Sequence, residues 1–306
     1  MADCSISACD ILPVGRPSLL STVADYWTLT KPEVNFLILI ATSAGFYLGC
    51  PSNLPFFPFG RMLNALFGTL LVASGTGTLN QFLEYRFDAR MRRTCRRPVA
   101  AGRLRPATAA WFGVSLSIIG AAYLLIAVNA LASALAVLTL VSYLFVYTPL
   151  KRRTPLCTLA GAFPGAMPPL IGWAAASGSI TSGKAWILYA VLFLWQFPHF
   201  MAIAWMYRED YAQAGYLIFP TNSDRSFLTW MTCVPSFALF AAGFWAVAAN
   251  SEGLFQYSAT AILGSGLLYY SIHQVCLRSR IAARQLLKAT IAYLPLQFLI
   301  VALGKS

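Results

Sequence analysis

Long apolar segments follow one another along most of this chain, and they constrain its fold more than any other feature. Nine of them can be placed at residues 34–50, 62–79, 107–127, 131–147, 156–176, 185–206, 227–249, 255–275 and 286–303. Most reach the roughly 17 to 25 residues that a helix needs to cross a bilayer. Helices are expected because every backbone polar group inside the bilayer must find its partner within the protein. The sequence therefore predicts an all-α, polytopic membrane bundle of nine transmembrane helices.

The amino-acid composition agrees with a chain surrounded by the lipid bilayer. Only 10% of the residues are charged and 58% are hydrophobic, whereas soluble domains carry about 25% charged residues. The formal net charge of +12 does not indicate nucleic-acid binding, because the basic residues occupy short gaps between apolar segments. We therefore expect a lipid environment and no nucleic-acid partner.

The first thirty residues differ from the rest of the chain. They are polar and include Asp3, Asp10 and Asp25. They lack the pattern of a signal peptide and are not the Arg-rich, acid-poor sequence of a mitochondrial presequence, which favours a bacterial source. We expect residues 1–30 to form a cytoplasmic N-terminal tail and residues 31–306 to form a single membrane-embedded domain.

The distribution of lysine and arginine predicts the orientation in the membrane. Of the 22 such residues, 19 belong to the N-terminal segment and to the regions that follow the second, fourth, sixth and eighth apolar segments. Only Arg61, Lys184 and Lys305 belong to the other side. Because cytoplasmic loops are enriched in basic residues, we expect a multi-pass protein of the bacterial inner membrane. Its N-terminus would be cytoplasmic and its C-terminus external.

Residues 80–105 hold two carboxylates and eight arginines directly after the second apolar segment. Asn80, Glu84 and Asp88 are spaced four residues apart, so on a helix they form one stripe with steps of about 6 Å along the axis. Amide and carboxylate oxygens are hard ligands that suit a magnesium ion shared with phosphate. The stripe predicts a metal-assisted phosphate site at the membrane surface.

Cations follow this stripe. Arg93 and Arg97 can donate forked, charge-assisted hydrogen bonds to phosphate oxygens, and Lys151 and Arg152 follow the fourth segment. The alternative is an ordinary cytoplasmic loop, which is basic because of its side of the membrane. That alternative accounts for the arginines equally well, but it does not account for carboxylates on one helix face.

A second acidic group follows the sixth apolar segment, on the same predicted side of the membrane. Residues 195–215 include His199, Arg208, Glu209 and Asp210. The chain has only 10 aspartates and glutamates in all. Four of them flanked by cations in one compartment therefore indicate a site for a diphosphate and its metal ion rather than a solvated surface.

The stretch NQFLEYRFDARMRRTCRRP at residues 80–98 resembles the N-x-x-x-D-x-x-x-D … R-T-x-x-R-P signature of the UbiA-type intramembrane prenyltransferases. Four further stretches resemble the heme-farnesylating branch of that family. They are DYWTLTKP at 25–32, YTPLKRRT at 147–154, WQFPHFMAIAWMYREDYAQAG at 195–215 and ARQLLKATIAYLPL at 283–296. The resemblance covers nearly the whole chain, and the family has nine helices.

The resemblance implies transfer of the farnesyl group of farnesyl diphosphate to a vinyl group of heme B. Water then adds to give heme O, so heme B is a substrate and not a cofactor. It also implies Mg²⁺-assisted loss of diphosphate, and heme A synthase or a terminal oxidase as partners. By position, the metal ligands and catalytic residues would be Asn80, Glu84, Asp88 and Asp210, and the substrate-binding residues would be Arg93, Arg97, Lys151, Arg152, His199 and Arg208.

Two departures from the family pattern stand out. Glu84 replaces the commoner aspartate, which lengthens the carboxylate arm by one methylene. The second acidic motif of many relatives is D-x-x-x-D, but that spacing falls here on Tyr207 and Tyr211. The remaining carboxylates, Glu209 and Asp210, are neighbours and would point about 100° apart on a helix. We therefore favour Asp210 over Glu209 as the residue that serves a second metal ion or orients the first.

His199 has two interpretations. A histidine inside a membrane segment indicates function, and imidazole is a common axial ligand of heme iron. Alternatively, its ring hydrogen-bonds a backbone carbonyl freed by Pro198. Two other functions also stay open for the chain as a whole. One is a related prenyltransferase with another aromatic acceptor, such as a hydroxybenzoate or a chlorin, and the other is a polytopic transporter.

Overall fold

The computed structural model describes residues 18–52, 55–218, 225–250 and 253–305, and within these residues every regular element is a helix. The first part of the bundle contains α1 (Leu19–Leu29), α2 (Pro32–Gly49), α3 (Phe59–Asp88), α4 (Pro106–Ala127), α5 (Ala130–Val141), the π-helix η1 (Ser142–Tyr147) and α6 (Thr148–Leu150). The second part contains α7 (Cys157–Gly165), α8 (Met167–Ser177), α9 (Gly183–Met206), α10 (Arg208–Gln213), α11 (Arg225–Asn250), α12 (Leu254–Leu277) and α13 (Arg280–Leu303).

The all-α membrane class is confirmed, whereas the predicted count of nine spans is not. Seven helical stretches of the described chain are long and apolar enough to cross a bilayer: α2, α3, α4, Ala130–Leu150, α9, Ser226–Asn250 and α13. The predicted segment 156–176 is instead two short helices, because Pro168 and Pro169 lack the N–H groups that would continue α7. The predicted segment 255–275 coincides with α12, whose amide, hydroxyl and imidazole side chains lower its mean hydropathy.

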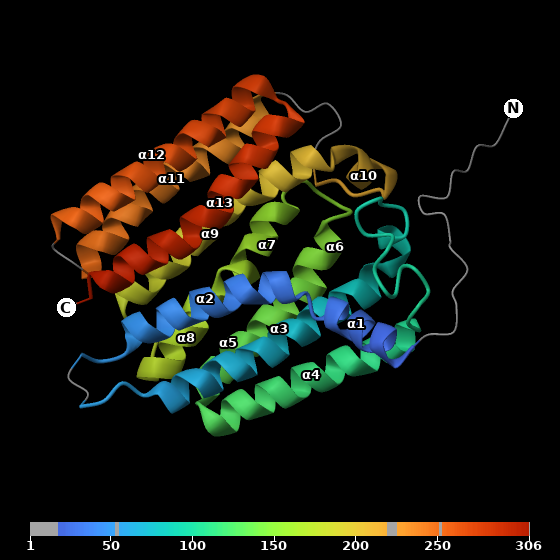
Figure 1. Cartoon of the computed structure of the whole chain (residues 1–306), viewed down its shortest axis with the longest axis horizontal. Helices are drawn as coiled ribbons and strands as arrows, with labels where there is room; N and C mark the ends of the chain where they lie inside the picture. Colours follow the sequence, from blue (N-terminus) through green and yellow to red (C-terminus); the bar gives the residue numbers. More distant parts are fainter. Residues whose placement is uncertain (1–17, 53–54, 219–224, 251–252, 306) are drawn as a thin grey trace, which may run out of the picture.

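The helices pack side by side as a bundle (Figure 1). Helix α3 lies along α4, α2 lies along α8, and α11 packs against both α9 and α12. The α2–α8 contact is close because of glycines. A Cβ atom at Gly172 would collide with the carbonyl oxygen of Thr42, and one at Gly45 would collide with that of Pro169. Small residues at such crossings let helix backbones approach each other within membranes.

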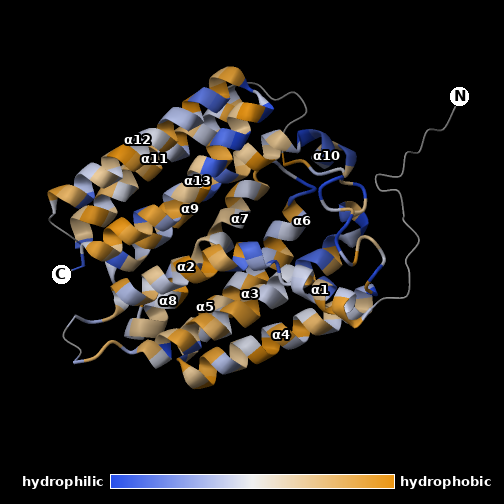
Figure 2. Ribbon diagram, viewed as in Figure 1, coloured by the Kyte–Doolittle hydropathy of each residue, from blue (hydrophilic) through white to orange (hydrophobic). Residues whose placement is uncertain are grey.

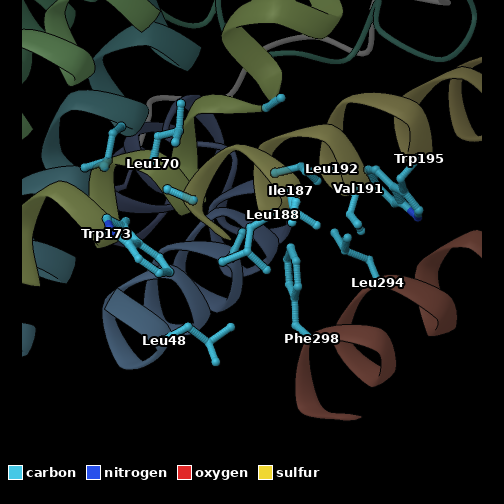
Figure 3. Packing of buried hydrophobic residues seen from close by; sticks show 14 of the residues in the cluster. Leu48, Leu170, Trp173, Ile187, Leu188, Val191, Leu192, Trp195, Leu294 and Phe298 are labelled. Atoms are coloured by element: carbon cyan, nitrogen blue, oxygen red, sulfur yellow. The ribbon is translucent and has the colours of Figure 1, made fainter. Parts of the chain in front are cut away.

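The apolar core lies between α2, α8, α9 and α13 (Figure 3). Leu48, Trp173, Leu188 and Phe298 are buried there, one from each of these helices. Large apolar side chains also cover the outside of the bundle. Ile126, for example, is 84% exposed, as expected for a surface that faces lipid.

Hydrophilic residues gather at one end of the bundle (Figure 2). Residues 89–105, the end of α6 and the whole of α10 lie at this end, and the C-terminal end of α13 lies at the opposite end. The three connections that carry the predicted site therefore meet in space, although they follow three different helices.

Candidate functional site

The last turns of α3 carry the predicted stripe of oxygen donors. Asn80, Glu84 and Asp88 are 2%, 5% and 2% exposed, whereas Leu83 on another face of α3 is 45% exposed. The three side chains therefore share one buried face, as their spacing requires.

Two lysines from distant segments bind the first half of this stripe. Lys31 Nζ donates to Asn80 Oδ1 at 2.8 Å, and Lys151 Nζ donates to both carboxylate oxygens of Glu84 at 3.0 Å. Asn80 Nδ2 in turn donates to Glu84 Oε2 at 2.9 Å and to Thr148 Oγ1 at 3.3 Å. The amide thus links the two lysine contacts into one hydrogen-bond network.

An arginine from the following loop binds the last member of the stripe. Arg97 Nη1 donates to both oxygens of Asp88, at 2.9 and 2.8 Å. The loop is held in place by Thr94, whose hydroxyl donates to the Asp88 carbonyl at 2.9 Å. The Asp88 side chain and backbone therefore both anchor the arginine-rich loop to the end of α3.

Sequence reasoning did not assign Lys31 to the site. It is the second of the two residues between α1 and α2, with φ of 54° in the left-handed region that a residue with a side chain rarely adopts. The following Pro32 makes extended backbone the ordinary choice at this position. Strained backbone of this kind is found mostly where function requires it. Two signals were available: the position of a lysine directly before the first membrane helix, and its place in the family-like stretch DYWTLTKP at 25–32.

Side chains of α2 and α3 hold the strained turn around Lys31. Asn35 Nδ2 donates to the Thr30 carbonyl at 2.8 Å, and Gln81 Nε2 donates to the Leu29 carbonyl at 3.0 Å. Gly77 lets the lysine cross α3, because a Cβ atom there would lie only 3.3 Å from Lys31 Cδ. The turn and α3 thus position the Lys31 ammonium over Asn80.

The two lysines differ in their electrostatics. Burial, together with the neighbouring Arg97 and Lys151, lowers the pKa of the Lys31 ammonium to about 7, although Glu84 and Asp88 act to raise it. Burial also acts to lower the pKa of Lys151, but the Glu84 carboxylate beside it raises that pKa well above its usual value. Lys151 is therefore a permanent cation of the site.

The second acidic group is organised around Arg93. Asp210 Oδ2 accepts a hydrogen bond from the Arg93 backbone N–H at 3.2 Å, and Arg93 Nη2 donates to the Tyr211 hydroxyl at 3.0 Å. The guanidinium also lies 4.8 Å from the ring centre of Tyr207 and 5.5 Å from that of Tyr211. The two tyrosines at the expected aspartate positions therefore hold an arginine by cation–π contact.

A cavity of about 270 Å³ opens beside this arginine. It is lined by Arg92, Arg93, Met206, Tyr207, Glu209, Asp210 and Arg280. Cationic and acidic side chains share the cavity, which lies at the hydrophilic end of the bundle rather than in its apolar core.

Other predicted residues lie apart from the stripe. Arg208 packs over the Trp205 ring at 4.8 Å and approaches the exposed Glu209 carboxylate at 3.8 Å. Arg152 lies over the ring of Phe87 at 4.7 Å. In the part of the chain that the structure describes, neither arginine forms an ion pair with the stripe.

His199 belongs to a separate polar contact between α9 and α13. Its Nδ1 atom lies 2.9 Å from Thr290 Oγ1, and its ring stacks on Trp195 with ring centres 4.4 Å apart. Of the two interpretations of His199, the hydrogen bond to a backbone carbonyl freed by Pro198 is replaced at Nδ1 by this hydroxyl. The difference arises because α13 packs against α9 at this level, which the sequence pattern does not predict.

The donor set of the stripe fits a magnesium ion shared with a substrate. No group of three or more His, Cys, Asp and Glu side chains could hold a metal ion by itself within the described ranges. Mg²⁺ rarely uses such a cage and is usually bound by one or two carboxylates together with substrate phosphates. The buried Tyr216 hydroxyl also lies beside this stripe, next to Glu84. Burial raises the pKa of that hydroxyl, and the nearby Glu84 raises it further.

Comparison with known proteins gives a family and close relatives. The sequence pattern of the UbiA prenyltransferase family matches residues 38–294. Protoheme IX farnesyltransferase of Solibacter usitatus is 42% identical over 279 residues, covering 89% of this chain and 95% of the relative. The protein of the same name from Koribacter versatilis is 39% identical, covering 96% of this chain and 97% of the relative.

Solved structures share the fold at low sequence identity. A digeranylgeranylglyceryl phosphate synthase matches with a TM-score of 0.73 at 17% identity, covering 92% of this chain and 98% of that one. A UbiA homolog from Archaeoglobus fulgidus, bound to DMAPP and Mg²⁺, matches with a TM-score of 0.62 at 12% identity, covering 90% and 99%.

Proposed function

Because the chain belongs to the UbiA prenyltransferase family, we propose that it transfers the farnesyl group of farnesyl diphosphate to a vinyl group of heme B. Addition of water then gives heme O and diphosphate. The observation that carries this proposal is the buried stripe of Asn80, Glu84 and Asp88, bound by cations from three separate segments. Relatives of up to 42% identity over most of the chain that are named protoheme IX farnesyltransferase support the choice of substrates.

The cations of the site suit the departure of diphosphate. Lys151 and Arg97 balance the two carboxylates of the stripe, and Lys31 adds a positive charge to the site when it is protonated. Lys151 and Arg97 can turn from those carboxylates, and Lys31 from the Asn80 amide, to the diphosphate oxygens as the carbon–oxygen bond breaks. Charges held in a dry site stabilise the developing anion strongly. Arg93, held by its two tyrosines, is positioned to add a forked contact to the same group.

Asn80, Glu84 and Asp88 would hold Mg²⁺ together with the substrate diphosphate. When bound, the ion supplies Lewis-acid stabilisation of the leaving group. Asp210 is bound to the Arg93 backbone, so we assign it to orienting the loop of Arg93 and, through this loop, the diphosphate.

The bonds and charges of the reaction balance without a redox partner. The allylic carbon–oxygen bond breaks and its electron pair leaves with diphosphate. The terminal vinyl carbon of heme B then forms a bond to the farnesyl cation, which places a positive charge on the carbon next to the porphyrin ring. Water adds there and loses a proton, which diphosphate can accept. We assign His199 to binding the heme, since it lies on α9 about two turns before the end of that helix that leads to α10 and the proposed diphosphate site.

We place this chain in the bacterial inner membrane, with its N-terminus and its diphosphate site on the cytoplasmic side. The hydrophilic end of the bundle that holds α10 (Figure 2) also carries the arginine-rich residues 89–105, which supports this orientation. Heme O is then available to heme A synthase or to a terminal oxidase, the two partner classes that the resemblance implies.

Labelled farnesyl diphosphate tests the proposal directly. Membranes that contain the protein are supplied with either heme B or 4-hydroxybenzoate, and the products are separated by chromatography. We expect label in heme O and none in the benzoate. Label in the benzoate alone would overturn the proposed acceptor, and no transfer to either would overturn the prenyltransferase assignment. A deletion strain provides a second test, since its pigments should lack heme O.

A further inference from the structure

Thr290 of α13 contacts two side chains of α9 at once. Its hydroxyl lies 2.9 Å from His199 Nδ1, and its backbone carbonyl accepts a hydrogen bond from Trp195 Nε1 at 2.7 Å. Thr290 is fully buried and Trp195 is nearly so. Figure 3 shows Trp195 on α9 facing Leu294, which lies one turn after Thr290 on α13. A polar cluster at this depth of a membrane bundle indicates a functional constraint.

The hydrogen bonds of Thr290 determine which nitrogen of His199 carries the proton. A threonine hydroxyl has one proton to donate, and Thr290 Oγ1 donates it to the Leu287 carbonyl at 2.7 Å. The hydroxyl therefore accepts from His199, and Nδ1 must be the protonated nitrogen. The neutral ring then has its lone pair on Nε2.

The rest of the cluster fixes the plane of the ring. Trp195 stacks on His199 with ring centres 4.4 Å apart and an angle of 21° between the planes. The position of the indole is fixed by the hydrogen bond from its N–H to the Thr290 carbonyl. Among the residues that the structure describes, Nε2 of His199 has no hydrogen-bond partner. One nitrogen is thus locked, and the other is available to a ligand.

We infer that Thr290 is a positioning residue that holds His199 as the Nδ1–H tautomer, so that Nε2 can bind the iron of the heme substrate. This inference rests on the proposed function, because it takes heme B as the acceptor. A neutral imidazole nitrogen is a common axial ligand of heme iron. A hydrogen bond from its other nitrogen fixes the tautomer and the ring orientation of such a ligand.

The test uses the purified full-length protein in lipid nanodiscs. Ferric heme B and metal-free protoporphyrin IX are titrated separately, and the dissociation constant, the Soret band and the electron paramagnetic resonance of the iron are recorded. For the unmodified protein we expect iron-ligand signals of histidine with heme B and weaker binding of the metal-free porphyrin. His199→Ala should lose the histidine signals, and added imidazole should restore them.

Thr290 variants separate positioning from packing. Thr290→Val keeps the shape but removes the hydroxyl, and we expect heme affinity to fall about tenfold, with broadened ligand signals. Thr290→Ser keeps the hydroxyl and should bind heme like the unmodified protein. Thr232→Val is the matched control, since this buried threonine of α11 has no partner for its hydroxyl within the described residues. It should leave both the affinity and the spectrum unchanged.

The outcomes distinguish the inference from the function on which it rests. Unchanged affinity and spectrum in Thr290→Val would overturn the role of Thr290, and an unchanged spectrum in His199→Ala would overturn the iron contact as well. Either result can occur while heme O is still formed. If the unmodified protein forms no heme O, the proposed function itself is wrong. If Thr290→Val does not fold, Trp195→Phe replaces it. Removal of the indole N–H should weaken heme binding, and unchanged binding would overturn the inference.

Discussion

Two regions of this bundle bury polar side chains, and they hold them in opposite ways. At the end of α3, Glu84 and Asp88 are each paired with a cation from a different segment of the chain. Between α9 and α13, His199, Trp195 and Thr290 form a neutral cluster of hydrogen bonds. The cations at α3 can exchange their carboxylate partners for the oxygens of an anionic substrate. The neutral cluster instead keeps the His199 ring in one orientation. The first region therefore suits chemistry on diphosphate, and the second suits the positioning of an acceptor.

The largest effect should come from removing one charge of the α3 stripe. Asp88→Asn and Glu84→Gln keep the side-chain size, and we expect either to reduce turnover by about 100-fold or more. Prenyl transfer in membranes with matched protein amounts measures this. Glu209→Gln is the control, because that carboxylate is exposed. Near-normal turnover of both stripe variants would remove the stripe from the mechanism.

Lys31 should be the next most sensitive position, although sequence reasoning did not assign it. Lys31→Met keeps the aliphatic arm across Gly77 and removes the ammonium that binds Asn80. We expect turnover to fall by about tenfold to 100-fold. Lys184→Met provides the matched loss of one lysine. Lys184 lies in the first turn of α9, at the end of that helix away from α10, and its substitution should have no effect on turnover. Equal activities of the two variants would show that Lys31 has only a structural role.

A smaller effect is expected from the tyrosines that hold Arg93. Tyr211→Phe keeps the ring under the guanidinium but loses the 3.0 Å hydrogen bond. We expect kcat/KM for farnesyl diphosphate to fall about fivefold, which corresponds to about 1 kcal/mol for one hydrogen bond. Steady-state kinetics with varied farnesyl diphosphate measures this. A larger loss in Tyr207→Phe than in Tyr211→Phe would contradict the account, since no hydrogen bond from the Tyr207 hydroxyl to Arg93 occurs within the described chain.

The smallest effect is expected at Arg208, which resemblance assigned to substrate binding. Its guanidinium lies over Trp205 and beside an exposed glutamate, and such surface contacts contribute little. Arg208→Ala should keep kcat/KM within about twofold of the unmodified value. A tenfold loss of kcat/KM would instead show that Arg208 contributes to diphosphate binding.

The contrast between the two regions also explains what the sequence could predict. The stripe follows from local helix geometry, so the spacing of Asn80, Glu84 and Asp88 was sufficient to place them on one face. The apolar segments likewise predicted the membrane bundle. The Lys31 contact depends on a strained turn, and the His199–Thr290 contact joins residues 91 positions apart. No local periodicity encodes such contacts, because they arise only when the helices pack.

The Arg93 site shows a further limit of reasoning from motifs. Tyr207 and Tyr211 read as a lost acidic motif, since the family pattern has aspartates at that spacing. In the folded protein the two rings contact the Arg93 guanidinium instead. The two rings therefore bind a cation where the family pattern has carboxylates, and this contact depends on a loop that begins more than a hundred residues earlier in the sequence.

The central claim is that the oxygen stripe of α3 works with a divalent metal ion to release diphosphate. Prenyl transfer to heme B in stringently chelated membranes, before and after Mg²⁺ is restored, tests it most directly. We predict that transfer falls to background on chelation and recovers with Mg²⁺, and that Asp88→Asn recovers only at a higher Mg²⁺ concentration or not at all. Undiminished transfer under chelation would contradict the account.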